Sequence, residues 1–291
     1  MNSHSSNSLK HRVVVITGSA RGMGRAFAHG FLAAGAKVVA TDKSWAGVEP
    51  LSTDQGQPEK ALMVADMDIT DGTQIDRVCT AALERFGRID ALINNAAMRQ
   101  RDLFPPTGRV TTLETEDSDW EKSFAVNVFG TLKVIRRFIK PMIVQRRGSI
   151  VNVVSSGILN HSDGGAYMAL RPNSREMPYQ SAKAALACFS FYLANEVAEH
   201  NVAVNIVIPG HTRTTGFDEQ NRARMNASRG TGPQPLVPEH IVPIVLHLAA
   251  QDASSITGRM FDVMRWNIEH GLGGHDKWVD ESFSYHSLKK D

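Results

Sequence analysis

The sequence predicts a single α/β domain built on a doubly wound, seven-stranded parallel sheet that is flanked by helices. Seven short runs rich in apolar and β-branched residues alternate with segments whose apolar residues recur every three to four positions. This alternation is typical of βαβ units, in which the strands are parallel. With 42% hydrophobic and 21% charged residues, the 291-residue chain can form a large core and fits one such domain better than two.

Each element follows from its local pattern. Strands are expected at residues 12–17, 37–41, 61–65, 90–94, 149–154, 202–208 and 259–263. Helical periodicity between them predicts helices over residues 22–34, 71–86, 120–144, 179–200 and 238–250. We expect residues 1–11 to be a disordered leader, residues 12–264 to form the domain, and residues 265–291 to be a C-terminal tail.

Charge and composition exclude several classes of protein. The 32 Lys and Arg residues nearly balance the 30 Asp and Glu residues, which argues against nucleic acid as a partner. Apolar runs fall short of the roughly 18 to 20 residues that span a bilayer, so no membrane partner is expected. The leader lacks the apolar segment of a secretory signal; its lack of acidic residues fits a transit peptide, but its scarcity of Arg does not. Cys79 and Cys188 are expected to be buried free thiols, which favours a cytoplasmic protein.

A glycine-rich turn directly follows the first expected strand. Its glycines permit a tight turn and let the backbone approach a pyrophosphate, while the N–H groups that begin the next helix supply positive potential. The spacing is GxxxGxG, which differs from the better-known GxGxxG pattern. Its position after the first strand predicts a dinucleotide-binding turn that contains Gly18, Ser19, Arg21, Gly22, Met23 and Gly24.

The choice between NAD and NADP depends on Asp42, which ends the second strand 18 residues after Gly24. A carboxylate there accepts both ribose hydroxyls of NAD and repels a 2′-phosphate, although an Asp at this position can also simply cap a turn. Arg21 and Lys43 favour NADP, because their cations can pair with that phosphate. We expect NAD, with NADP as the less favoured cofactor, since a phosphate can bind there only after the carboxylate is neutralised.

Two more strand ends contribute to the same predicted site. Asp68 and Ile69 follow the third strand, where an adenine would lie. Asn95 and Ala96 follow the fourth strand, where a small residue lets the cofactor ribose approach the backbone. The paired amides of Asn94 and Asn95 are expected to tie adjacent strand ends together.

A tyrosine and a lysine four residues apart open the helix at residues 179–200. Tyr179 and Lys183 share one helix face, and a positive charge about 5 Å from the phenol is worth roughly 3 kcal/mol, or about two pKa units. Such a phenol is suited to general acid/base catalysis near neutral pH. Ser155, or its neighbour Ser156, ends a strand where a hydroxyl can face a ligand. A second YxxxK match, which begins at Tyr285, lies in the tail without a following apolar helix and is interpreted as coincidental.

Together these motifs resemble the short-chain dehydrogenase/reductase family over residues 10–265. The resemblance implies a Rossmann-type fold, with Tyr179 as the general acid/base and Lys183 lowering its pKa and binding the nicotinamide ribose. It further implies that Ser155 binds the reacting oxygen and that Asn127 anchors a water in a proton relay. The motifs that carry it are TGSARGMG at 17–24, Asp68, NNAA at 94–97, Asn127, Ser155, YQSAK at 179–183 and the Pro209, Gly210 and Thr212 segment, expected to hold the carboxamide.

The resemblance implies an NAD(P)-dependent oxidoreductase that interconverts a secondary alcohol and a ketone, assembled as a homodimer or homotetramer. A non-catalytic dinucleotide sensor would be expected to lose Tyr179, Lys183 or Ser155, and an epimerase or dehydratase would favour a longer chain. The 11 histidines lack metal-ligand spacing, so no metal is expected.

Three long connections leave from the carboxyl ends of strands, at residues 98–119, 156–178 and 211–237. We expect them to shape the substrate pocket, with 156–178 as a wall or lid. His161 and His211 lie in these connections, where either substrate contact or simple exposure is open. Large apolar residues mixed with arginines fit a ring or chain with an acidic group, or merely solvated arginines.

Overall fold

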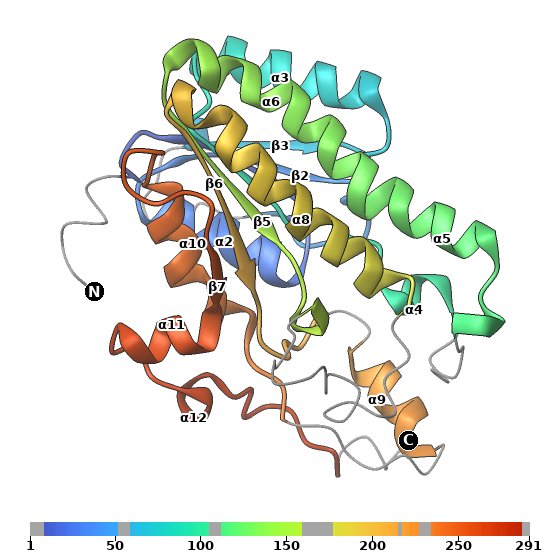
Figure 1. Ribbon diagram of the computed structural model, residues 1–291. Helices are drawn as coiled ribbons and strands as arrows, with labels where there is room; N and C mark the ends of the chain where they lie inside the picture. The colour runs from blue at the N-terminus through green and yellow to red at the C-terminus, as the bar shows by residue number, and fades with distance from the viewer. Residues whose placement is uncertain are drawn as a thin grey trace.

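A parallel sheet forms the centre of the molecule (Figure 1). The computed structural model describes residues 9–51, 59–104, 112–158, 177–214, 217–226 and 234–286. Its seven strands pair in the order β3-β2-β1-β4-β5-β6-β7, and every pairing is parallel. The predicted fold class is therefore confirmed. The strands are β1 (Val13–Thr17), β2 (Lys37–Asp42), β3 (Leu62–Asp66), β4 (Ala91–Asn94), β5 (Gly148–Val153), β6 (Val202–Ile208) and β7 (Met260–Asp262).

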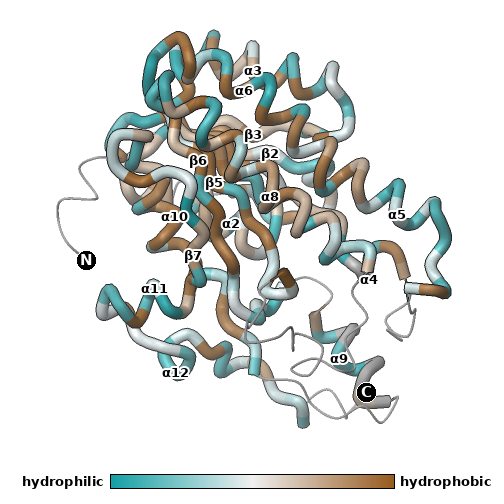
Figure 2. The backbone as a smooth tube through the Cα atoms, viewed as in Figure 1, coloured by the Kyte–Doolittle hydropathy of each residue, from teal (hydrophilic) through white to brown (hydrophobic). Residues whose placement is uncertain are grey.

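Helices cover both faces of the sheet, which explains why its central strands read as continuous apolar runs. Every residue of β1, β4, β5 and β6 is buried. Figure 2 shows the hydrophobic residues concentrated on the strands and on the inner sides of the helices. One face carries α2 (Gly22–Ala33), α10 (Val242–Ala249) and α11 (Val263–Glu269), and the other carries α3 (Gly72–Phe86), α6 (Thr131–Gln145) and α8 (Tyr179–Val197).

The helix expected over residues 120–144 is interrupted by a π-helical turn. It consists of α5 (Asp117–Phe124), the π segment η3 (Ala125–Gly130) and α6. A π turn inserts an extra residue, so the apolar faces before and after it are rotated relative to one another. Within this turn Val128 is buried, whereas Phe129 is 56% exposed.

Several short elements carry no periodicity that the sequence could reveal. They lie in the connections and at the chain end rather than in βαβ units. The helices are α4 (Gln100–Leu103), α9 (Phe217–Asn226) and α12 (His275–Trp278); the 3₁₀ turns are η1 (Glu59–Ala61), η2 (Thr112–Glu114), η4 (Ser156–Ile158), η5 (Ala198–His200) and η6 (Pro238–Ile241).

Two expectations from the sequence, on Leu9 and on Cys188, need correction. Leu9, assigned to the leader, is only 1% exposed and belongs to the core, so the ordered domain begins before residue 12. Cys79 is buried as expected, but Cys188 is exposed. Cys188 lies in α8 beside the buried Leu186 and Ala187, on the part of the helix that turns away from the sheet. The described part of the tail packs on the domain, since Asn267 and Phe283 are buried.

None of the helices in the described parts of the chain is long and apolar enough to span a membrane.

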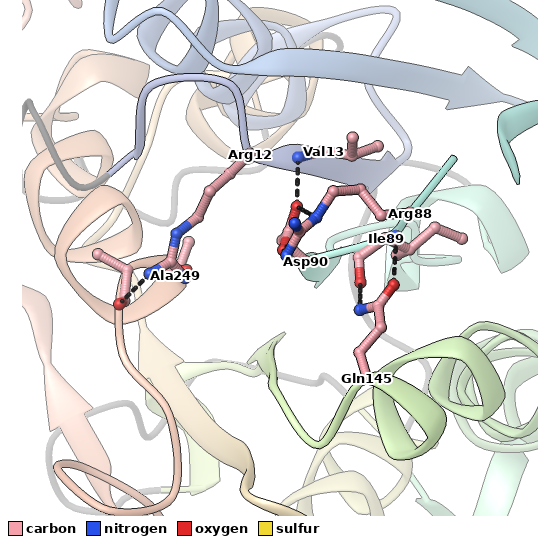
Figure 3. Close-up of polar contacts among 8 residues, drawn as sticks. Arg12, Val13, Arg88, Ile89, Asp90, Gln145 and Ala249 are labelled. Carbon is pink, nitrogen blue, oxygen red and sulfur yellow. Dashed lines mark hydrogen bonds and ion pairs between the residues drawn. The ribbon is translucent and has the colours of Figure 1, made fainter. Parts of the chain in front are cut away.

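A buried carboxylate ties three strands together at their amino ends (Figure 3). Asp90 accepts the backbone N–H of Val13 at 2.9 Å and is held by the Arg88 guanidinium, whose Nε lies 2.9 Å from Oδ2. The backbone of Asp90 also accepts the N–H of Ser149, so the residue joins β1, β4 and β5. Beside Asp90, the side chain of Gln145 at the end of α6 accepts the N–H of Ile89 and donates to the Ile89 carbonyl. These contacts around Asp90 lie at the amino ends of the strands, opposite the carboxyl ends.

Replacing Asp90 with Ala should lower the free energy of unfolding by about 2 to 3 kcal/mol, because it leaves the Val13 N–H buried without its acceptor. Urea denaturation measures the change. Glu269→Ala is the matched control, since Glu269 pairs with Arg265 on the surface and its loss should leave the free energy of unfolding nearly unchanged. Equal losses in the two variants would contradict the assigned role of Asp90.

Candidate active site

A cavity of about 700 Å³ opens at the carboxyl ends of the strands. It spans the point where β1 and β4 are neighbours and the order of the strands reverses, which is where open α/β sheets bind ligands. Most of the residues selected from the sequence line it. They are Gly18, Arg21, Gly22, Met23, Asp42, Asp68, Ile69, Asn95, Ala96, Ser155, Tyr179, Lys183, Pro209, Gly210 and Thr212.

The glycine-rich turn is shaped by close backbone approach. Gly18 has a φ of +67°, and a Cβ on it would lie 2.7 Å from the Cα of Ala96. A Cβ on Gly24 would lie 2.0 Å from the carbonyl oxygen of Gly18. The Asn95 amide donates to the carbonyl of Gly18 at 2.8 Å, and Asn94 donates to Asn152 at 2.8 Å. The predicted tie between strand ends is therefore confirmed.

Two residues of this turn do not line the cavity. Ser19 is fully buried, and its hydroxyl donates to the carbonyl of Thr41 at 3.0 Å, which holds the turn against β2. Gly24 packs against Gly18 behind the turn. Both residues shape the turn from behind. A serine beside a glycine can face either way, which is why the sequence did not distinguish these roles.

The charged groups at the adenine end are paired with one another. Asp42 accepts the backbone N–H of Ala20 at 2.9 Å, which holds its carboxylate at the glycine-rich turn. The Lys43 ammonium lies 2.9 Å from the carboxylate of Asp68. Burial alone would raise the pKa of Asp68, but hydrogen bonds from Thr70 and Lys43 outweigh it, so the pKa lies below its ordinary value. Lys43 is thus engaged by a neighbouring acid.

Tyr179 and Lys183 begin α8 and face the cavity together. The Lys183 ammonium lies 5.8 Å from the centre of the Tyr179 ring and donates to the carbonyl of Val153 at 2.9 Å. Burial lowers the pKa of Lys183 to about 8, because the charged form loses its hydration. The expected juxtaposition of phenol and ammonium is therefore present at the start of α8.

Ser155 is brought to the same space by a turn that packs against α8. It follows β5, and its hydroxyl oxygen accepts the N–H of Gly157 at 3.3 Å. A Cβ on Gly157 would lie 2.0 Å from the terminal amide group of Gln180, so the glycine lets this turn pack against the Gln180 side chain as it now lies at the start of α8. Nothing in the sequence indicated that Gly157 and Gln180 are in contact, although this contact lies between Ser155 and Tyr179.

Asn127 is buried beside the cavity but does not line it. It lies in the π turn, and its amide donates to the carbonyl of Met98 at 2.8 Å and accepts the Met98 N–H at 3.1 Å. Its side chain therefore holds the connection that follows β4, which includes the cavity residues Met98 and Arg99. The resemblance also implies that Asn127 anchors a water in a proton relay. The hydrogen bonds to Met98 do not test this role, which stays a prediction.

A buried histidine supports the segment after β6, and sequence reasoning missed it. His240 Nε2 accepts the N–H of Gly210 at 3.2 Å, while Nδ1 lies 2.8 Å from the carbonyl of Val237. Burial lowers the pKa of His240 to about 4, so the ring is neutral at neutral pH, with Nδ1 as the donor. Asn267 in turn donates to the His240 carbonyl at 2.8 Å. A histidine within an apolar helical pattern gives no signal for this contact.

Some expectations fall on residues outside the described ranges. Residues 159–176, most of the expected lid, are among them, as is His161. Tyr285 packs edge-on against Phe283, whereas Lys289, its partner in the second YxxxK match, lies beyond residue 286. Within the described ranges, no cluster of three or more His, Cys, Asp or Glu side chains could hold a metal ion.

Comparison with known proteins agrees with this geometry. The model of the short chain dehydrogenase family matches residues 12–225. The chain is 51% identical to fluoren-9-ol dehydrogenase of Terrabacter sp. (strain DBF63), over 92% of this chain and 75% of that protein. It is 30% identical to the 3-oxoacyl-[acyl-carrier-protein] reductase FabG of Salmonella typhimurium, over 88% of this chain and 97% of that protein. The crystal structure of levodione reductase shares the fold, with a TM-score of 0.69 and 24% identity, over 87% of this chain and 96% of that one.

The chain belongs to the short-chain dehydrogenase family. This is a family of oxidoreductases that use nicotinamide cofactors.

The buried lysine should cost the protein stability below pH 8. Lys183 has a pKa of about 8 when folded and near 10.5 when unfolded, so between these values the unfolded chain binds more protons and stability rises with pH. Lys183→Met should therefore raise the free energy of unfolding at pH 7 by about 2 kcal/mol, since the pKa difference is worth about 3 and the lost hydrogen bond about 1. The gain should disappear above pH 10.5.

Urea denaturation of the cofactor-free protein from pH 7 to 11 measures this difference. Lys140→Met, on the exposed side of α6, should leave the pH dependence unchanged. A constant offset between wild type and Lys183→Met at every pH would show that burial of the charge is not its cause.

Proposed function

We propose that the protein is an NAD-dependent dehydrogenase that interconverts a secondary alcohol and a ketone. The observation that carries this proposal is that one cavity joins the glycine-rich cradle to Ser155, Tyr179 and Lys183. The cradle fits a dinucleotide, because side chains at Gly18 and Gly24 would collide with the backbone that forms it. The residues proposed to contact the cofactor are those that line the cavity from Gly18 to Thr212, with Ser19 and Gly24 holding the turn.

A bound nicotinamide would supply the acceptor for the hydride that leaves the alcohol carbon. Ser155 would donate a hydrogen bond to the reacting oxygen, and Tyr179 would take the proton from that oxygen. The positive charge of Lys183, 5.8 Å from the phenol ring, favours the tyrosinate that this step requires. We propose that Asn127 completes a path for the proton from Lys183 towards solvent.

The substrate we propose is a flat aromatic alcohol of the fluoren-9-ol type. The support is the 51% identity to fluoren-9-ol dehydrogenase over 92% of this chain. The cavity that contains Ser155 is also lined by apolar side chains and aromatic rings, among them Met98, Val126, Tyr179 and His211, beside the charged Arg99, Asp102 and Lys183. Oxidation of such an alcohol yields a conjugated ketone, fluoren-9-one in the case of fluoren-9-ol.

Tyr179→Phe should abolish nearly all oxidation of fluoren-9-ol, with a loss of about 10²-fold or more in kcat. The variant keeps the ring and removes only the ionisable oxygen, so the Kd of NAD should stay within about twofold. Tyr285→Phe is the matched control and should leave kcat unchanged. The absorbance of the NADH formed measures kcat in both variants. Full activity in Tyr179→Phe would refute the assignment of Tyr179 as the general base.

The proposed preference for NAD over NADP is supported by the pairing of charges at the adenine end. The carboxylate of Asp42 lines the cavity and is fixed by the N–H of Ala20. Lys43, which otherwise favours a 2′-phosphate, is engaged by Asp68 at 2.9 Å. Arg21 is exposed, and its Nη2 lies 3.5 Å from the carbonyl of Ala46. An anionic phosphate would therefore face an uncompensated carboxylate.

Asp42→Ala should shift the ratio of kcat/KM for NAD over NADP towards NADP by about tenfold or more, because one like-charge contact is removed. Initial rates with both cofactors measure the ratio. Asp66→Ala, one strand further out and outside the cavity lining, serves as the control. A wild-type enzyme that already prefers NADP would contradict the assignment.

We propose a homodimer or homotetramer that assembles through α8 and the π turn. These neighbouring elements leave large aromatic side chains exposed: Phe129 at 56%, Phe191 at 40% and Tyr192 at 70%. Burial of such rings between subunits would stabilise the assembly. Light scattering at micromolar concentration should show a dimer or tetramer, and Tyr192→Asp should shift it towards a 32 kDa monomer; a monomeric wild type would contradict the proposal.

We also propose a cytoplasmic location, which is consistent with the exposed free thiol of Cys188.

A further inference from the structure

The C-terminal segment beyond α12 packs against the connection that follows β6. Residue Leu236 bridges Thr212 on one side in parallel and Val279 on the other in antiparallel fashion. Backbone hydrogen bonds continue the ladder: the Val237 N–H donates to Trp278, and the Asp280 N–H donates to Pro235. The tail is therefore the outer strand of a small ladder whose inner strand, at Thr212, lines the cavity. Figure 1 shows this segment running along the same side of the molecule as α9.

Arg213 connects the tail to α9. Its guanidinium donates to Asp218 through Nε at 2.9 Å and to Asp280 and Ser282 through Nη1 at 3.1 and 2.9 Å. It also lies 5.3 Å from the centre of the Phe283 ring. Hydrogen bonds and charges from Asp218 and Asp280 raise the pKa of Arg213 against the opposing effect of burial, so it stays charged. One cation thus holds two acids from different parts of the chain.

A chain of aromatic rings leads from the tail to the cavity. Phe283 packs edge-on against Phe217 with centroids 5.4 Å apart, and Phe217 packs against His211 at 5.0 Å. Phe217 and Phe283 are buried, at 4% and 5% exposure. His211 lines the cavity and follows β6, next to β5 and therefore on the side of Ser155 rather than of Asp42.

We propose that residues 278–283 form an outer wall behind His211, without lining the cavity themselves, and set specificity for a flat aromatic alcohol by positioning His211. The proposal rests on the alcohol dehydrogenase function proposed above. The rings of Phe283 and Phe217 hold the imidazole of His211 at the cavity, where it packs against the ring system of the substrate. Phe283, Arg213 and Phe217 are positioning residues, since His211 is the member of this chain of contacts that lines the cavity.

Phe283→Ala tests this role through selectivity. With saturating NAD, the KM for fluoren-9-ol should rise about five- to tenfold, because a loosened wall loses apolar contact with the substrate. The KM for cyclohexanol, which is too small to need the wall, should change less than about twofold. The Kd of NAD should stay constant, and Phe283→Leu, which keeps most of the volume, should restore part of the selectivity.

Phe261→Ala is the matched control, because Phe261 in β7 is a partly buried phenylalanine outside the cavity lining. It should leave the ratio of kcat/KM for the two alcohols unchanged. An unchanged ratio in Phe283→Ala would overturn the proposal. If Phe283→Ala does not fold, Asp280→Ala combined with Ser282→Ala removes the polar contacts of the tail to Arg213 and should shift the ratio in the same direction. No shift would equally overturn the proposal.

Hydrogen exchange separates this proposal from the proposed function. The N–H groups of Val237 and Asp280 form the backbone hydrogen bonds between the tail and the connection after β6, so both groups should exchange faster in Phe283→Ala than in wild type, whatever the enzyme turns over. Wild-type protein that oxidises no alcohol would refute the proposed function. Unchanged exchange at both N–H groups would refute the wall by itself.

Discussion

The site depends on how closely two backbones approach at the centre of the sheet. The loop after β1 lies against the loop after β4, so that a single methyl group on Gly18 would fall 2.7 Å from the backbone of Ala96. Asn95 fills the remaining space and donates to the carbonyls of Thr17 and Gly18. This contact places the N-terminus of α2 at the edge of the cavity, where its free N–H groups can face an anion. Asp42 completes the arrangement from β2 through the N–H of Ala20.

Most of the fold could be predicted because it depends on local chemistry. Strands buried on both faces must be continuously apolar, and helices against a sheet must be periodic, so all seven strands lie within a residue or two of their expected positions. The site was predictable for the same reason. Parallel strands end at one edge, and residues i and i+4 of a helix share a face, so Asp42, Ser155, Tyr179 and Lys183 had to converge.

Other features depend on contacts between distant parts of the chain and left no local signal. Asn127 reads as a mid-helix polar residue, yet a π turn directs it to the backbone of Met98. Ser19 reads as part of a phosphate-binding turn, yet it donates to Thr41. The tail has no periodicity of its own, and its order comes from the backbone around Leu236. Position in a motif predicted which residues gather at the site, but not which of them face the cavity.

The central claim is that this cavity transfers a hydride directly between an alcohol carbon and a nicotinamide. Fluoren-9-ol that carries deuterium at C9, incubated with the protein and NAD, tests it most directly. The account predicts that the deuterium appears on C4 of the reduced nicotinamide, with the ketone formed in equal amount. Deuterium released to water, or ketone formed without reduced cofactor, would contradict it.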